Sequence, residues 1–196
     1  QHKNIDIFEV GNLLLLKKLK IKNKDEVGFI INLAGNAHTS VSESSKLYNL
    51  KRKSTNIEKN IKNNFNAKTV KVIQISSAKV TEKSTIKCNP YEVFYSLIKL
   101  KSEAYIKKYF KKYIILRPPL LYGPGVKANF LSLISLINSG LPLPLKNINN
   151  LRNYVYIDNF VDLILRIIQK KLFLNKVYYI KDSESISTSQ LYYKIT

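Results

Sequence analysis

Residues 69–80 read TVKVIQISSAKV, where a run rich in Val and Ile passes into a segment of small residues. Side chains branched at Cβ favour extended backbone, so 69–75 is predicted to be a strand. Ser76, Ser77 and Ala78 follow it directly. Small residues leave room for a ligand, and their hydroxyl groups can donate hydrogen bonds to it. The end of this strand is therefore a candidate position for a functional site.

Helices and strands alternate on both sides of this segment. Upstream, 27–34 is an apolar strand, and Leu and Ile recur at near-helical spacing within 42–66. Downstream, Asn89 can cap a helix that Pro90 opens and that runs to about Phe110. The other predicted elements are strands at 5–10, 113–116, 154–157 and 177–181, helices at 13–19, 130–137 and 158–170, and a last helix opened by a capping box of Ser187 and Gln190.

This alternation predicts an α/β protein with a parallel sheet covered by helices on both faces, because crossover connections place helices there. A chain of 196 residues, 45% of them hydrophobic, is long enough to bury such a core. We divide it into a larger part at 1–117 and a smaller mixed part at 118–196, whose elements partly return to the sheet. Ligands of such sheets bind beyond the carboxyl ends of the strands.

The formal net charge is +20, which would suit a nucleic-acid partner. The basic residues are 29 Lys and 4 Arg, however, and they are scattered along the whole chain. A nucleic-acid-binding protein gathers its basic residues on one face or motif, and no helix-turn-helix, zinc-finger or RNP signature occurs here. We therefore predict no nucleic-acid partner.

The remaining composition excludes several other classes. The single cysteine, Cys88, has no partner for an internal disulfide, and His2 and His38 lack the spacing of metal ligands, so no metal site is predicted. Lys, Asn and Ser interrupt every apolar run before it reaches 18 residues, so no integral membrane segment is expected. With no secretory signal pattern, we expect a reducing, cytoplasmic location.

Tyr95 and Lys99 lie four residues apart in the predicted helix that begins at Pro90, and hence on one face of it. An ammonium group in that position can stabilise a phenolate, which would let Tyr95 exchange protons with a substrate. Such pairs also arise by chance. This pair is informative because it follows the strand ending in Ser76 and Ser77 and precedes the strand at 113–116.

This arrangement resembles the extended short-chain dehydrogenase/reductases, specifically the NAD-dependent epimerase/dehydratase family. Three segments resemble that family's strand-four cofactor loop, Asn-initiated helix and catalytic-serine segment, namely 31–35 (INLAG), 56–58 (NIE) and 76–80 (SSAKV). The more specific segments resemble bacterial UDP-sugar 4-epimerases and 4-ketosugar reductases, and these are 116–131 (LRPPLLYGPGVKANFL), 140–145 (GLPLPL) and 152–159 (RNYVYIDN).

The resemblance implies a Rossmann-like fold. In it, 1–117 is an incomplete NAD-binding part that carries the catalytic residues, and 118–196 holds a small C-terminal substrate lobe. The family's glycine-rich fingerprint, G-x-x-G-x-x-G, does not occur, so we expect the first βαβ unit to be missing and the chain to be truncated at both ends. Lys59 and Ile98 also depart from the family's pattern, which has Gly and Ser at these positions.

The resemblance also implies roles for individual residues. Ser77 orients a sugar hydroxyl, Tyr95 removes or returns its proton, and Lys99 tunes Tyr95 and holds the nicotinamide ribose. The NAD-binding set is Leu33, Ala34, Gly35, Asn56, Tyr95, Lys99 and Pro118. The substrate-binding set is Ser77, Asn129, Phe130, Leu131, Leu141, Pro142 and Arg152, the last directed toward the diphosphate.

The activity implied is nucleotide-sugar 4-epimerisation by NAD-dependent hydride transfer at carbon 4, on a UDP-hexose or UDP-N-acetylhexosamine, in surface polysaccharide biosynthesis. Two alternatives stay open. One is an NAD(P)-dependent 4-ketosugar reductase of the same family, and the other is a non-catalytic fragment that binds a sugar nucleotide only. The family's members usually form dimers through the helices that here span about 54–66 and 90–110, so a homodimer is a further expectation.

Overall fold

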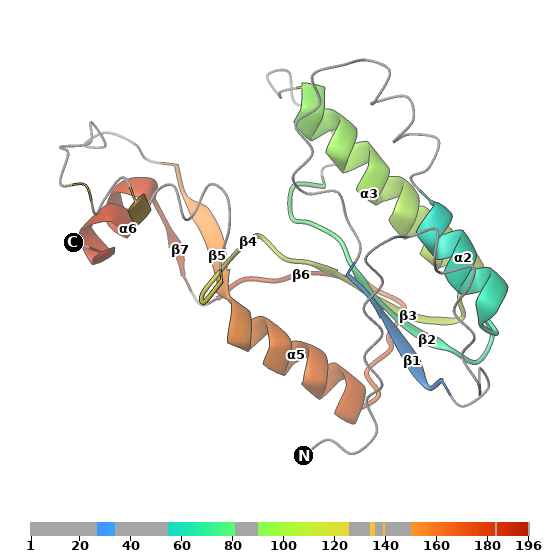
Figure 1. The fold of residues 1–196 in the computed structure, drawn as a ribbon. Coiled ribbons are helices and arrows are strands. Elements are labelled where there is room, and N and C mark those ends of the chain that lie inside the picture. The colour runs from blue at the N-terminus through green and yellow to red at the C-terminus, as the bar shows by residue number, and fades with distance from the viewer. Residues whose placement is uncertain are drawn as a thin grey trace.

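The computed structural model describes residues 27–33, 55–80, 90–125, 134–135, 139, 150–182 and 184–195. Four of its strands form one parallel sheet in the order β1-β2-β3-β6 (Figure 1). They are β1 (Phe29–Asn32), β2 (Lys71–Ile75), β3 (Lys112–Arg117) and β6 (Val177–Tyr179). The predicted parallel sheet is confirmed, and all four strands point their carboxyl ends toward the same edge.

Alternation along the strands sends apolar side chains to both faces of this sheet. On β2, Ile73 and Ile75 pack in one buried cluster, whereas Val72 packs in another. The first cluster is closed by α5 (Ile157–Gln169), and the second by α2 (Asn56–Asn64) and α3 (Pro90–Tyr109). Figure 1 shows α5 on one side of the sheet and the α2–α3 pair on the other. The expected α/β architecture with helices on both faces is therefore present.

The helices meet the sheet through regularly spaced apolar residues. From α5, the buried side chains are Phe160, Ile164 and Ile167, which recur every three or four residues as one helical face requires. On the opposite side, Ile61 of α2 and Ile106 of α3 pack against Val72. The helices expected from Pro90 to about Phe110 and at 158–170 are thus present as α3 and α5.

A second, three-stranded sheet has the order β4-β5-β7 and consists of β4 (Leu120–Tyr122), β5 (Arg152–Tyr156) and β7 (Ser185–Ile186). Beside it, α6 (Thr188–Ile195) begins with the predicted capping box. Its Ser187 N–H donates to Gln190 Oε1 at 2.8 Å, and the Gln190 N–H donates to Ser187 Oγ at 3.1 Å. Leu191 of α6 then packs against Tyr154.

Several predicted boundaries are wrong by a few residues. The apolar strand expected at 27–34 is β1 at Phe29–Asn32, and the strand expected at 154–157 is β5 at Arg152–Tyr156. Helix α5 begins at Ile157, one residue before the expected start at 158, so Asp158 lies in its first turn. Strands β4 and β7 were not predicted. The elements expected at 5–10 and 13–19, and most of 130–137, lie outside the described residues.

The turn that follows β4 needs glycine at Gly123. Its φ is +139°, and a Cβ built there would lie 2.6 Å from Ile157 Cγ2. The chain can therefore bring the end of β4 against the start of α5 only without a side chain at this position. Within the described part of the chain, no helix is both long and apolar enough to span a membrane.

Candidate active site at the carboxyl edge of the sheet

The parallel sheet places the residues that follow β1, β2 and β3 along one edge. Leu33, expected near the cofactor, follows β1 and is 68% exposed. Pro118, from the same expected set, follows β3, and its carbonyl accepts a hydrogen bond from the Ala78 N–H at 2.8 Å. The structure thus joins the segment after β2 to the segment after β3, beside the position where a ligand of such a sheet binds.

Tyr95 and Lys99 lie on α3 as predicted, and their side chains approach each other. Lys99 Nζ lies 5.9 Å from the centre of the Tyr95 ring and donates a hydrogen bond to the Ile75 carbonyl at 3.2 Å. That carbonyl belongs to the last residue of β2, two residues before Ser77. Lys99 therefore connects Tyr95 to the strand end that carries the candidate catalytic serine.

Lys99 is a buried cation, with 6% of its surface exposed. Burial lowers the pKa of Lys99, because the ammonium loses hydration, and the negative charges of Glu58 and Glu103 oppose that shift. An ammonium has three donors, and the hydrogen bond to Ile75 takes one of them. The group can therefore offer further hydrogen bonds to a ligand at this edge.

Ser77 lies in a short turn after β2. Its Oγ accepts a hydrogen bond from the Lys79 N–H at 3.2 Å, and its carbonyl accepts one from the Val80 N–H at 3.1 Å. A hydroxyl that accepts in this way keeps its own proton free to donate, as a residue that orients a sugar oxygen must. Its role, like the roles of Tyr95 and Lys99, stays a prediction.

The other predicted site residues fall into two groups. Asn56 is the exposed first residue of α2, and Arg152 is the exposed first residue of β5 in the three-stranded sheet. Arg152 thus belongs to a different sheet from β2, the strand that Ser77 follows and whose last carbonyl accepts from Lys99 of α3. The remaining predicted residues lie outside the described part of the chain, namely Ala34, Gly35, Asn129, Phe130, Leu131, Leu141 and Pro142.

Sequence reasoning missed a buried polar layer between the sheet and α3. Asn32 Nδ2 donates to Gln74 Oε1 at 2.8 Å and to Glu58 Oε1 at 3.3 Å, and Ser102 Oγ donates to the same Glu58 oxygen. Asn32 and Gln74 are direct partners across β1 and β2. Glu58 is 2% exposed, and its Oε2 is buried without a hydrogen-bond partner among the described residues. These groups lie on the opposite face of the sheet from the apolar core under α5.

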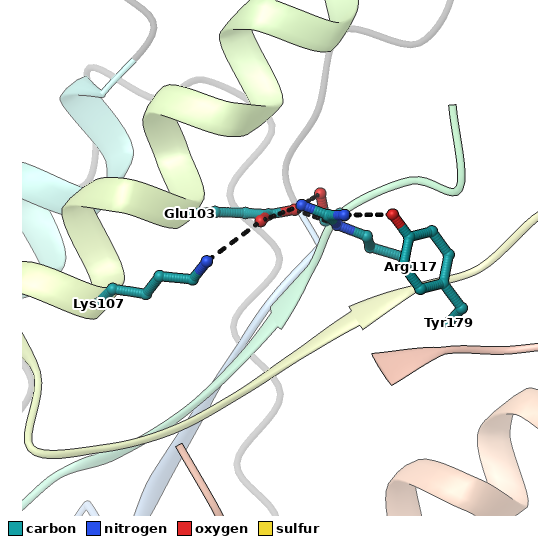
Figure 2. Close-up of polar contacts among 5 residues, drawn as sticks. Glu103, Lys107, Arg117 and Tyr179 are labelled. Carbon is teal, nitrogen blue, oxygen red and sulfur yellow. Dashed lines mark hydrogen bonds and ion pairs between the residues drawn. The ribbon is translucent and has the colours of Figure 1, made fainter. Parts of the chain in front are cut away.

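A second buried polar group centres on Glu103 (Figure 2). Arg117 Nε donates to Glu103 Oε1 at 2.9 Å, and Arg117 Nη2 donates to Oε2 at 2.7 Å. Arg117 Nη1 also donates to the Tyr179 hydroxyl, and Ser76 Oγ donates to Glu103 Oε1 at 2.5 Å. Two features of the sequence could have indicated this buried polar group. Glu103 follows Lys99 by four residues, and Arg117 is a lone arginine at the end of the apolar strand β3.

Comparison with known proteins agrees with this architecture. The family model of the NAD dependent epimerase/dehydratase family matches residues 3–180. A UDP-glucose 4-epimerase from Vibrio cholerae is 32% identical over 203 residues, covering 94% of this chain and 61% of that protein. The chain therefore spans less than two thirds of that relative's length.

Solved structures resemble the fold at lower identity. The Bordetella bronchiseptica enzyme WbmF, in complex with NAD+ and UDP, has a TM-score of 0.68 at 20% identity, covering 94% of this chain and 59% of that chain. A dTDP-4-dehydrorhamnose reductase from Clostridium acetobutylicum has a TM-score of 0.67 at 21% identity, covering 94% and 65%. These likenesses show the shared fold, and the match of the family model over residues 3–180 shows that this chain belongs to the NAD-dependent epimerase/dehydratase family.

Proposed function

We propose that this chain carries the catalytic residues of a nucleotide-sugar 4-epimerase that acts on a UDP-hexose or UDP-N-acetylhexosamine in surface polysaccharide biosynthesis. The observation that carries the proposal is Lys99, a buried ammonium 5.9 Å from the Tyr95 ring and hydrogen-bonded to the end of β2. A phenol and an ammonium held together at the carboxyl edge of a parallel sheet suit proton transfer to a bound sugar. The 32% identity to a UDP-glucose 4-epimerase supports the choice of substrate.

The residues present fit one end of the family's cofactor. Lys99 has donors to spare for ribose hydroxyls, and the strand ends after β1 and β3 provide a surface beside it. NAD, when bound, supplies hydride acceptance and donation at carbon 4 of the sugar. The glycine-rich turn that binds the pyrophosphate in such folds is not part of this sequence. We therefore assign Leu33, Lys99 and Pro118 to the nicotinamide end only.

The chain's own part in the reaction is proton transfer. We assign to Tyr95 the removal of the proton from the sugar's 4-hydroxyl as carbon 4 is oxidised, and its return when carbon 4 is reduced from the other face. Lys99 stabilises Tyr95 as a phenolate before the proton is removed and after it is returned, because it lies beside the ring with its hydration removed; between the two steps Tyr95 holds the proton as a neutral phenol. Ser77 orients the hydroxyl through its free O–H.

The test is interconversion of UDP-glucose and UDP-galactose by the purified chain with added NAD⁺ and without added reductant, followed by NMR of the anomeric protons. We expect Tyr95→Phe to lower turnover by about 10²- to 10⁴-fold, the usual contribution of a general acid or base. The matched control is Tyr193→Phe, since Tyr193 is 71% exposed on α6 and its substitution should leave turnover unchanged.

Other results point to the alternatives. Equimolar consumption of NAD(P)H with a 4-keto sugar, and no interconversion, would indicate a 4-ketosugar reductase. Thermal stabilisation by UDP-sugar without any by NAD would indicate a non-catalytic sugar-nucleotide binder. A ligand at 100 times its Kd stabilises the folded state by about 2.7 kcal/mol, which such a measurement detects easily.

A further inference from the structure

Four residues of α3 repeat at four-residue steps, and their side chains form one ladder. They are Tyr95, Lys99, Glu103 and Lys107. Four residues advance about 40° around a helix with 3.6 residues per turn, so such a ladder drifts slowly across the helix surface. The side chain of Glu103 is 1% exposed and that of Lys107 is 44% exposed. Lys99 and Glu103 are thus the two charged rungs that face the sheet.

We propose that Glu103 is a positioning residue for the candidate active site, one that fixes the strand end carrying Ser77 and balances the charge of Lys99. The catalytic role of Glu103 rests on the proposed function, whereas its part in fixing the end of β2 does not. Glu103 does not reach substrate in this assignment, and it acts through Ser76, Arg117 and Lys99.

Both oxygens of Glu103 are engaged. Oε1 accepts from Ser76 Oγ at 2.5 Å and from Arg117 Nε at 2.9 Å, whereas Oε2 accepts from Arg117 Nη2 at 2.7 Å. Lys107 Nζ lies 3.9 Å from Oε2, at the exposed end of the group (Figure 2). A bidentate arginine pair fixes the carboxylate in plane as well as in position, so it presents Oε1 to Ser76 in one orientation.

Two side chains of α3, those of Lys99 and Glu103, hold two successive residues at the carboxyl end of β2. Lys99 donates to the carbonyl of Ile75, and Glu103 accepts from the hydroxyl of Ser76. The Ser76 N–H also donates to the Leu116 carbonyl at 2.7 Å. Ser77 comes next in the chain, so its direction depends on a residue that is held from α3 and from β3 at once.

The network extends across the sheet to β6. Arg117 pairs with Tyr179 in the register of β3 and β6, and its guanidinium lies 5.1 Å from the Tyr179 ring while donating to the hydroxyl. Glu103 therefore links the ends of β2, β3 and β6 to α3. Without the carboxylate, Arg117 would be left as a buried cation, 5% exposed, that has lost its ion pair with Glu103.

The charge of Glu103 also acts on Lys99. The carboxylate raises the pKa of Lys99 against the larger lowering by burial, with Glu58 acting in the same direction. The charge of Lys107 has a smaller effect on Lys99 than the charge of Glu103 has, because Lys107 is exposed and water screens its charge. Replacing Glu103 by a neutral residue should therefore lower the pKa of Lys99 further, and a merely structural contact would not have this effect.

The test compares Glu103→Gln with the parent chain by hydrogen–deuterium exchange and by turnover. We expect amide exchange in residues 76–80 to rise at least about tenfold, kcat to fall about tenfold with KM changed less than about twofold, and the alkaline limb of the pH–rate profile to move to lower pH. Lys101→Gln, an exposed substitution on the same helix, is the control and should match the parent chain.

A second variant distinguishes the loss of Glu103 itself from misfolding caused by an unpaired Arg117. Glu103→Met with Arg117→Met removes both charges together, which buried ion pairs often tolerate, and faster exchange in 76–80 should persist. Parent-like exchange in both variants would overturn the proposal, as would an equal effect from Lys101→Gln. If the parent chain shows no epimerase activity, the proposed function fails, and the exchange data still decide whether Glu103 positions Ser76 and Ser77.

Discussion

Lys99 has a charged side chain and is nevertheless buried, and these two properties rarely occur together. Removing an ammonium from water is costly, so such a residue persists where a site gains from it. Lys99 offsets part of the cost through the Ile75 carbonyl and two nearby carboxylates, and its pKa still lies below the ordinary lysine value of 10.5. Burial is thus the larger effect, and it gives a measurable pH dependence.

We predict that the stability of the parent chain relative to Lys99→Met rises with pH as the solution approaches pH 10.5. Between the lowered folded pKa and the unfolded value of 10.5, the unfolded chain binds more protons than the folded chain, so raising the pH favours folding. Below the folded pKa, Lys99 is charged in both states and the penalty is constant. Urea unfolding of both proteins at several pH values measures the difference, and a difference that falls with pH would show that Lys99 is stabilised as a cation.

The sequence revealed Tyr95 and Lys99 but not Glu103, and the reason is physical. A phenol and an ammonium one turn apart in a helix after a Ser-Ser strand end form a local pattern that can be recognised without coordinates. Glu103 acquires its meaning from Ser76, 27 residues earlier, and from Arg117, 14 residues later. On its own it looks like an ordinary helix glutamate, the kind expected on a solvated face. Long-range pairing of polar groups leaves little trace in a single sequence.

Among the elements, the long helices and the strand of β-branched residues were predictable, and the strands defined by pairing alone were not. The β-branched run at 69–75 became β2, and the helices expected at about 90–110 and 158–170 became α3 and α5. Leu97, an apolar residue of α3, is 50% exposed, whereas Lys99 and Glu103 of the same helix are buried. Strand β4 has three residues and β7 has two, and each exists because it pairs with β5. The start of α5 was expected one residue late, at 158, whereas Tyr156 holds the cap position and its N–H donates to Asp182 Oδ2 at 3.0 Å.

The turn that follows β4 allows a stability test at a single glycine, Gly123. We predict that Gly123→Ala destabilises the chain by about 2 kcal/mol or more, since it adds both a strained φ and a close approach to Ile157. Gly125→Ala is the matched control, because Gly125 has a positive φ of +76° but nothing within 4 Å of a built Cβ. Chemical denaturation should show the larger loss for Gly123→Ala. Equal losses would mean that backbone strain alone matters and that the contact with Ile157 relaxes.

Across the molecule, positive charge is the property with the widest consequences. A net charge of +20 makes the chain repel copies of itself at low ionic strength. Polar and charged residues also occur on the surfaces of the two helices through which relatives in the family are expected to pair. On α3 the exposed residues include Leu97, Lys101 and Lys108, and on α2 they include Lys59. Apolar attraction and charge repulsion therefore oppose each other on this surface.

From this opposition we predict a homodimer through α2 and α3 that becomes tighter as salt is added. Raising the ionic strength from 0.1 M to 1 M shortens the screening length from about 10 Å to about 3 Å, which weakens repulsion between the lysines but leaves apolar contacts intact. Sedimentation equilibrium at both ionic strengths measures the dissociation constant. Leu97 is 50% exposed, so Leu97→Lys should weaken the dimer without lowering the stability of the monomer. A dimer that dissociates with salt, or one that Leu97→Lys leaves unchanged, would place the contact elsewhere.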